Sequence, residues 1–198
     1  MALRFKYLGS AIASNGILTF EVNSRVSAAW SKWRSMTGVL CDRKIPERLK
    51  SKIYRTIVRQ VAMYGAACWP ATKEVETRFS IVETKMLRWT AGVTRLDRIR
   101  NAEIRQRFGV APIAEKLREA RLRWYGHVFR ASGDTVRKIG LNIDVPGKRP
   151  KGRPKHRWLD TLHVDLKVAG IHPDQAFDRV KWRHHTRIAD PASKREKR

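Results

Sequence analysis

The chain has 198 residues, of which 43 are lysine or arginine and 18 are acidic, so its formal net charge is +25. Its length allows one domain or two small ones, and a hydrophobic content of 42% argues against a wholly disordered chain. The charge predicts nucleic acid as the partner ahead of an anionic membrane surface, because no run of 18 apolar residues occurs and the amphipathic patterns place Trp and Tyr at core-like positions. The sequence shows no signal peptide, which predicts an intracellular protein. Together with the charge, this predicts a ribonucleoprotein of the nucleus, the cytoplasm or both.

Residues 1–20 carry the signals of a small β-hairpin. The stretch RFKYLGSAIA alternates apolar and polar residues, and Asn15-Gly16 favours a tight turn before Ile17–Phe20. Two strands alone are marginal in water, so this hairpin needs a sheet or a helix to rest on. We therefore expect part of a larger fold to precede it.

Three amphipathic patterns follow and predict a three-helix bundle over residues 21–93. The first covers Glu21–Leu40, and the third is expected to begin after Thr72 and to end at Gly92. Stripes of apolar residues at helical spacing must be buried against one another, which is why three such helices should pack together.

The second helix of this bundle, expected between Pro46 and Gly65, has two distinct faces. Its predicted apolar arc consists of Leu49, Ile53, Ile57, Val61 and Tyr64. The opposite face carries a basic stripe without an acid, made of Arg48, Lys52, Arg55 and Arg59. Like charges at this spacing destabilise a helix, and a phosphate backbone would relieve the cost. The alternative is a solvated basic face with no partner.

Residues 94–145 predict a helical connector. A short basic helix should end at Gly109, and a longer helix should begin at Pro112, with Arg118, Arg121 and Arg123 on its polar side. Helical periodicity is then lost, and we expect one short strand or extended run at Ile139–Val145.

Residues 146–198 predict a basic C-terminal helical region with a disordered tail. Two prolines exclude a regular helix from its first part, which should be an extended, flexible segment rich in Gly and Pro. Six basic residues make this the basic segment: Lys148, Arg149, Lys151, Arg153, Lys155 and Arg157. It is a candidate nucleic-acid contact, and a nuclear localisation signal is the alternative. Trp158 next to it is a candidate for stacking on a base.

Two short helices should close the chain. The first is expected to run from Trp158 to Gly170, and the second from Pro173, with an inner face of Phe177, Val180, His184 and Ile188. The fold class is thus mainly α, with a short N-terminal hairpin, a three-helix bundle, and further helices joined by the extended basic segment.

The sequence offers little for catalysis. Its acids are scattered, and no paired-aspartate, metalloprotease, phosphate-loop or nucleophile-elbow motif occurs. Asp160, His163 and Asp165 only partly share a helical face, so we expect Asp165 to form ion pairs instead of holding a metal. Cys41 and Cys68 form no CxxC pair and are expected to be buried, reduced thiols. No cofactor is predicted for this chain.

A succession of short segments, in order along the chain, resembles a known family. They are FKYLGSAI (5–12), AAWSKWR (28–34), GVLCDRKIP (38–46), LKSKIYRTIVR (49–59), MYGAACWP (63–70), ETKMLRW (83–89), RLRWYGHV (121–128), GKRPKGRPKHRWLD (147–160) and the final KWR and ADP. Together they resemble the reverse transcriptases of non-LTR retrotransposons, and most closely the RTE clade that includes BovB-like elements. Gln60 and Ala67 depart from the family pattern, which hints at a decayed copy.

The resemblance implies which part of that enzyme this chain would be. It places FKYLG, which is Phe5, Lys6, Tyr7, Leu8 and Gly9, at the primer grip that closes the palm, and makes the following helices the thumb that holds the template–primer duplex. The family's magnesium-binding aspartates lie upstream of FKYLG, and its endonuclease is N-terminal; neither occurs here. Magnesium is therefore expected only in the full-length parent enzyme.

Two functions remain open on the sequence alone. The first is a nucleic-acid-binding C-terminal fragment of such an enzyme, inactive alone, whose partners are RNA, DNA and possibly the missing palm and fingers. The second is a stand-alone or domesticated basic helical protein that binds RNA or DNA.

Overall fold

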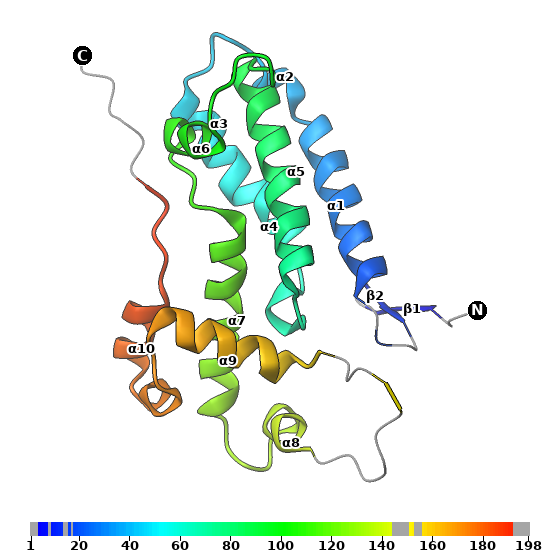
Figure 1. Cartoon of the computed structure of the whole chain (residues 1–198), viewed down its shortest axis with the longest axis vertical. Helices are drawn as coiled ribbons and strands as arrows, with labels where there is room; N and C mark the ends of the chain where they lie inside the picture. The colour runs from blue at the N-terminus through cyan, green and yellow to red at the C-terminus, as the bar shows by residue number, and fades with distance from the viewer. Residues whose placement is uncertain are drawn as a thin grey trace. The chain divides into compact units, whose positions relative to one another are not determined.

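The computed structural model describes residues 4–7, 9–13, 16, 18–143, 151–152 and 156–191. It is mainly helical, with a short antiparallel hairpin at the N-terminus, which confirms the predicted fold class (Figure 1). The chain forms two compact units. Unit 1 comprises Met1–Gly65, Lys73–Leu117 and Ile188–Arg198, and unit 2 comprises Ala66–Thr72 and Arg118–Arg187. This division differs from the four consecutive segments expected, because the last part of the chain returns to unit 1.

The hairpin pairs β1 (Arg4–Tyr7) with β2 (Ser10–Ala13), so that Phe5 faces Ile12 and Tyr7 faces Ser10. Its turn contains Gly9 at φ +84°, a backbone conformation that glycine adopts without steric cost. The strands therefore reverse at Gly9, and the prediction that they reverse at Asn15-Gly16 is wrong. The predicted second strand is wrong as well, since Thr19 and Phe20 already belong to helix α1.

Unit 1 is built on the expected bundle of three helices. Helix α1 (Thr19–Arg34) lies beside α5 (Lys73–Ala91) and beside a helix made of α3 (Glu47–Ile53), a π-helical turn η1 (Tyr54–Val58) and α4 (Arg59–Ala62) (Figure 1). The short α2 (Thr37–Leu40) lies between α1 and α3 in the chain. The apolar side chains buried in this unit include Val22, Ala29, Trp33, Leu40, Tyr54, Val58, Phe79 and Met86.

The second helix buries a different face from the one predicted. Leu49 and Tyr64 are 46% and 48% exposed, whereas Tyr54, Val58 and Ala62 are buried. The predicted arc is thus partly wrong. Ile53, Ile57 and Val61 are only half-buried. The buried set still repeats every four residues, but it is centred one residue further along the chain.

A buried carboxylate ties four parts of unit 1 together. Glu83 on α5 accepts hydrogen bonds from the Tyr54 hydroxyl at 3.1 Å, the Arg105 Nε at 2.9 Å and the Ile113 backbone N–H at 3.2 Å. Burial raises the pKa of Glu83, and the Arg105 guanidinium offsets part of that rise. These bonds link η1 and α5 to α6 (Asn101–Phe108) and to the start of α7 (Ile113–Phe129).

Unit 2 contains the later part of α7 together with α8 (Val136–Asn142), α9 (Trp158–Ala169), a 3₁₀ turn η3 (Pro173–Phe177) and α10 (Arg179–Thr186). Its core consists of Leu122, Tyr125, Leu162, Leu166, Ile171, Ala176 and Trp182. The extended run predicted at Ile139–Val145 is wrong for residues 139–142, which belong to α8; residues 144 and 145 lie outside the described part of the chain.

The closing helix of unit 2 also turns another face inward. Asp178 accepts hydrogen bonds from the backbone N–H groups of Val180 and Lys181 and so starts a new helix after η3. This break exposes Phe177 and Val180, which were predicted to be buried, and buries Trp182. The exposed His184 corrects the same prediction, whereas Ile188 is half-buried.

Gly126 lets α7 approach Trp182 closely. A β-carbon at Gly126 would lie 2.3 Å from the Trp182 Nε1, and that nitrogen donates a hydrogen bond to the Leu122 carbonyl at 3.1 Å. The RLRWYGHV and KWR segments are therefore coupled by packing.

Candidate nucleic-acid interface

The four residues of the basic stripe do not share one environment. Arg48 and Lys52 on α3 are exposed, whereas Arg55 in η1 is half-buried and Arg59 at the start of α4 is buried. Only the first half of the stripe therefore presents accessible charge to a partner in solution.

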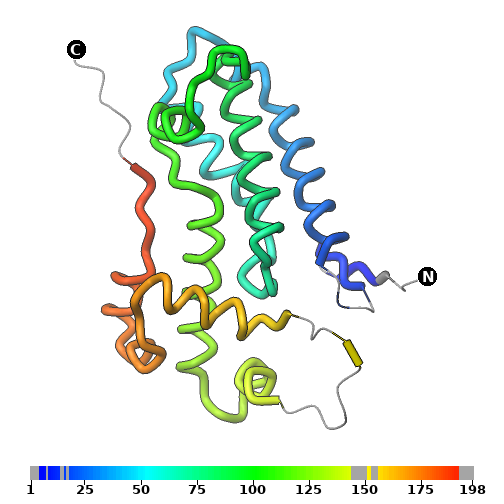
Figure 2. Tube along the Cα trace, viewed as in Figure 1, coloured from blue at the N-terminus to red at the C-terminus, as the bar shows by residue number. Residues whose placement is uncertain are grey.

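The second half of the stripe is occupied by an acid from the other end of the sequence. Arg59 donates through Nη1 and Nη2 to the two carboxylate oxygens of Asp190, each at 2.7 Å, and the Arg55 Nη1 lies 3.8 Å from the same carboxylate. Asp190 also accepts the Ala111 backbone N–H at 2.9 Å, and the Lys116 Nζ donates to the Ile188 carbonyl at 2.9 Å. Figure 2 shows the stretch that contains Ile188 and Asp190 in red.

The charges of this pair support each other. Burial alone would raise the pKa of Asp190, but the hydrogen bonds from Arg59 and Ala111 outweigh it and hold the pKa below its ordinary value. Burial alone would lower the pKa of Arg59, and Asp190 reverses that and raises it. The prediction of a stripe without acids is thus corrected: it holds along the helix, but not in three dimensions, and Arg59 has a structural partner.

A second arginine predicted on a polar face is entirely buried. Arg121 of α7 has no solvent exposure and donates from Nε and Nη2 to Asp165 of α9 at 2.6 and 3.0 Å. Arg118 lies 3.4 Å from the same carboxylate. The expectation that Asp165 forms ion pairs is confirmed, while placing Arg121 on the polar side was wrong. Arg123 is exposed, as predicted.

The basic segment is only partly covered by the structure. Lys148, Arg149, Arg153 and Lys155 lie outside the described residues. Lys151 and Arg157 are exposed, and the backbone N–H of Arg157 donates to Asp160 at 2.8 Å at the start of α9. The two described side chains are thus accessible to a polyanion.

Trp158 serves the packing of unit 2. Its Nε1 donates to the Ala67 carbonyl at 2.8 Å, and its half-buried ring lies 6.4 Å from that of Tyr125. The ring is thus engaged by a hydrogen bond at its nitrogen and by an aromatic neighbour. The stacking role predicted for it therefore has no support from its surroundings.

The primer-grip-like residues lie on the hairpin. Phe5, Lys6 and Tyr7 are exposed on β1, Leu8 lies outside the described residues, and the Gly9 carbonyl accepts a hydrogen bond from Arg25. The Ala11 N–H donates to the buried Glu21 of α1 at 2.5 Å. Polar contacts to α1 thus hold the hairpin in place and leave one apolar face of it open.

The buried acids in the described part of the chain lie close to arginines of the same chain. Glu21, Glu83, Glu119 and Asp165 are buried and Asp190 is mostly so, and each lies within ion-pair distance of an arginine: Arg25, Arg105, Arg123, Arg121 and Arg59, respectively. Each pair cancels one acid against one arginine, so the remaining side chains still carry the net charge of +25, with a higher ratio of basic to acidic residues than the whole composition.

Neither a metal centre nor a membrane span is visible in what the structure describes. Across those residues, no three His, Cys, Asp or Glu side chains gather in a way that could hold a metal ion. Cys41 and Cys68 are free and exposed, so the expectation that they are buried was wrong. Within the same residues, no helix is both long and apolar enough to cross a membrane.

Sequence reasoning missed one exposed basic site, the loop Val93–Arg100 between α5 and α6. Arg95, Arg98 and Arg100 are exposed there. The three arginines within six residues were a usable signal, but their lack of helical periodicity concealed it.

Comparison with protein-family models, with curated proteins and with solved structures finds no match to this chain.

Proposed function

We propose that this chain binds nucleic acid as the thumb and C-terminal region of a reverse transcriptase resembling those of RTE-clade, BovB-like non-LTR retrotransposons. In this proposal it grips a template–primer duplex or the element's RNA but does not polymerise by itself, because the paired aspartates that would hold magnesium are not in its sequence.

The observation that carries this proposal is the distribution of charge. The chain has a net charge of +25, and five of its acids form ion pairs with arginines; in four of these pairs both side chains are mostly buried. Self-repulsion among the remaining surface cations costs stability, and a polyanion that releases counterions on binding removes this cost.

The hairpin supports the polymerase part of the proposal. Phe5, Tyr7 and Ile12 are each more than half exposed, and the rings of Phe5 and Tyr7 stack 6.3 Å apart. Large apolar side chains grouped on a two-stranded sheet suit a surface that another part of a polymerase covers. The remainder of a palm domain is the partner that the resemblance implies.

A stand-alone basic RNA- or DNA-binding protein is the second candidate. Each unit has its own buried core, centred on Phe79 and Met86 in unit 1 and on Leu162 and Trp182 in unit 2. A chain with such cores can fold without a polymerase around it. Such a protein would also bind nucleic acid, but its exposed hairpin would have no palm domain to contact.

The test is a titration of the purified chain with a fluorescent primer–template duplex across a series of salt concentrations. We expect log affinity to fall linearly with log salt, with about −0.9 for each phosphate neutralised. Replacing the exposed pair by Arg48→Gln and Lys52→Gln should flatten this slope by about 0.9 for each phosphate that these side chains neutralise in the wild type. Binding that does not respond to salt, or no binding at all, would overturn the proposal.

Two controls complete this experiment. Lys73→Gln with Arg78→Gln removes the same charge from exposed positions on α5 and should leave the slope nearly unchanged. Extension of the primer above a no-protein control, with magnesium and nucleotides present, would contradict the inactive-fragment assignment. Addition of a palm domain that restores extension would favour the fragment over the stand-alone protein.

A further inference from the structure

The loop Val93–Arg100 is held in one conformation by a single arginine beneath it. Helix α5 ends at Gly92, where the Val93 N–H donates to the Arg88 carbonyl at 3.0 Å. The Arg88 side chain then donates to the Thr94 carbonyl at 3.0 Å, to the Ile99 carbonyl and to the Asn101 Oδ1 at 3.1 Å. These bonds join both ends of the loop, so its exposed side chains are positioned before any ligand arrives.

The tip of the loop holds an unfavourable backbone conformation. Arg98 has a φ of +51°, and among the residues that the structure describes no other non-glycine residue has a positive φ. Such a conformation is strained for a residue with a β-carbon and persists where a surrounding structure or a function requires it. A glycine here would remove the strain, yet it would also remove a cation.

The acid of this loop is engaged with its own turn. Asp97 accepts hydrogen bonds from the Thr94 backbone N–H at 2.6 Å and the Thr94 hydroxyl at 2.9 Å. These two bonds lower the pKa of Asp97, and the bond from the Thr94 backbone contributes more than the one from its hydroxyl. Its carboxylate thus closes the turn, and the positive charge of Arg95 and Arg98 stays available at the surface.

The loop and the last turn of α5 before it expose both charge and a flat apolar ring. Arg95, Arg98 and Arg100 are exposed, Leu96 is 90% exposed, and Trp89 on the last turn of α5 is 67% exposed. The Trp89 ring meets the buried Trp33 at 6.1 Å, edge to face, and Trp33 meets Trp30 at 5.6 Å. An aromatic ring backed in this way is rigid and still accessible.

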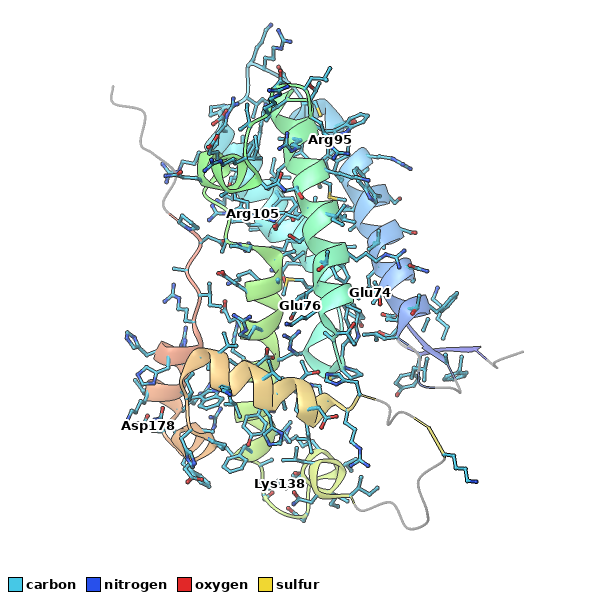
Figure 3. All side chains as sticks on the ribbon, viewed as in Figure 1. Glu74, Glu76, Arg95, Arg105, Lys138 and Asp178 are labelled. Atoms are coloured by element: carbon cyan, nitrogen blue, oxygen red, sulfur yellow. The ribbon has the colours of Figure 1, made fainter. Side chains whose placement is uncertain are left out.

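The two ends of α5 differ in charge: Glu74 and Glu76 balance Lys73 and Arg78 near the first, whereas three arginines and one acid follow the second. Figure 3 shows Arg95 beyond the C-terminal end of this helix and Glu74 and Glu76 near its N-terminal end. Cations near a helix C-terminus stabilise it, which would explain one basic residue here. Arg88 already fills that role, so the helix dipole does not account for three more arginines that face solvent.

We propose that this loop and Trp89 form a binding site for an unpaired nucleic-acid strand, an inference that rests on the proposed function. Arg95, Arg98 and Arg100 would neutralise successive phosphates, and a base would stack on the indole of Trp89. An unpaired strand suits the site better than a duplex does, because bases inside a duplex do not expose their faces.

The experiment is an anisotropy titration of the full chain with labelled oligo(dT), oligo(U) and a duplex of the same length, across salt. Arg95→Gln with Arg98→Gln should flatten the slope on single strands by about 0.7 for each phosphate that these side chains neutralise in the wild type. Trp89→Leu should weaken binding of single strands about tenfold at every salt concentration and hardly affect the duplex. Trp89→Phe, which keeps a stacking surface, should restore most of the affinity.

The matched control is Lys73→Gln with Arg78→Gln, which removes two exposed charges from the other end of α5. If this control lowers single-strand affinity as much as the loop variant does, the site is only general surface charge and the inference is overturned. Equal losses on duplex and single strands for Trp89→Leu would overturn it too. In both cases salt-dependent binding by the wild type would leave the proposed function standing.

Two further outcomes separate the remaining possibilities. If the wild-type chain binds none of the three ligands, the proposed function fails and this inference falls with it. Equal effects of the variants on oligo(dT) and oligo(U) would support a site for the features that DNA and RNA share, and an effect on one alone would identify the strand that the site takes.

Discussion

The helix formed by α3, η1 and α4 and the loop Val93–Arg100 are both rich in arginine, but the fold uses their charges differently. On the helix, Arg59 is buried and forms a bidentate ion pair with Asp190, and Arg55 lies near the same carboxylate. On the loop, Arg95 and Arg98 face solvent, and the neighbouring Asp97 is bonded to Thr94 instead.

This difference teaches that the sign of a stretch of sequence does not decide its role. An arginine becomes a structural element when the fold brings an acid to it, and it stays exposed to solvent when the local acid is otherwise engaged. Arg121 belongs to the first kind and Arg48 to the second. Substitutions of the two kinds should therefore change different quantities.

The largest expected effect is on the fully buried pair of unit 2. Arg121→Met leaves the Asp165 carboxylate buried with only Arg118 near it, so we expect the free energy of unfolding to fall by about 3–5 kcal/mol. Arg121→Met combined with Asp165→Leu removes both charges and should recover most of that loss. Hydrogen exchange of amides in α9 and α10 measures both variants. A double variant no more stable than the single one would contradict this view of the pair.

A smaller loss is expected at the contact between Arg59 and Asp190. Asp190→Asn leaves a buried guanidinium with a neutral acceptor, and because Asp190 is partly accessible we expect a loss of about 2–3 kcal/mol. Urea denaturation of the full chain measures it. Asp97→Asn, on an exposed acid of the same unit, is the matched control and should cost much less.

The same contact predicts a pH dependence. The pKa of Asp190 lies below its ordinary value of 3.8, so the folded state favours the ionised carboxylate. Its contribution to the free energy of unfolding is therefore fully present above about pH 4–5 and is lost as the pH falls through the folded pKa. Wild type and Asp190→Asn should differ in stability at about pH 6 and converge at strongly acidic pH. A difference that persists unchanged after the carboxylate is protonated would contradict the ion pair.

A substitution at Gly126 changes side-chain volume without changing charge, and so contrasts with the substitutions above. Gly126→Ala places a methyl group against the Trp182 ring, and we expect the free energy of unfolding of unit 2 to fall by about 1–3 kcal/mol. Salt dependence of nucleic-acid binding should not change at temperatures where the variant is folded. Gly133→Ala, at an exposed glycine with no atom nearby, is the control. Equal stability of the two variants would contradict the close packing at Trp182.

The smallest effect should have the opposite sign. Arg98→Gly removes the strain of a positive φ, about 1–2 kcal/mol, but adds about 0.5–1 kcal/mol of conformational entropy to the unfolded chain. We therefore expect the free energy of unfolding to rise by about 0.5–1 kcal/mol while single-strand affinity falls. Thermal denaturation and the anisotropy titration measure the two quantities. A loop that was merely structural would gain stability and keep its affinity.

Local signals in the sequence predicted the helices well and the contacts between them poorly. Gly92, Gly109 and Gly170 all lie at positive φ where helices were expected to end, because a left-handed residue is a local requirement. The partner of Arg59 is 131 residues away, and nothing near Arg59 in the sequence indicates it. The buried face of α10 was missed because Asp178 starts a helix where a continuous one was expected from Pro173.

For the candidate site, the sequence predicted the character of the surface and only part of its residues. Composition gave the net charge, and helical periodicity predicted that Arg48 and Lys52 are exposed. The loop beyond α5 was not, because its conformation depends on hydrogen bonds from Arg88 to backbone carbonyls that no pattern of side chains reveals.

Chemical footprinting of arginines on the wild-type chain tests the central distinction most directly. An arginine-selective dicarbonyl reagent, read by mass spectrometry, should modify Arg48, Arg95 and Arg98 in the free chain and leave Arg59 and Arg121 unmodified. Addition of nucleic acid should protect the exposed arginines. Modification of Arg59 and Arg121 as readily as the others, or no protection of Arg95 and Arg98 under conditions where the chain is bound, would contradict this account.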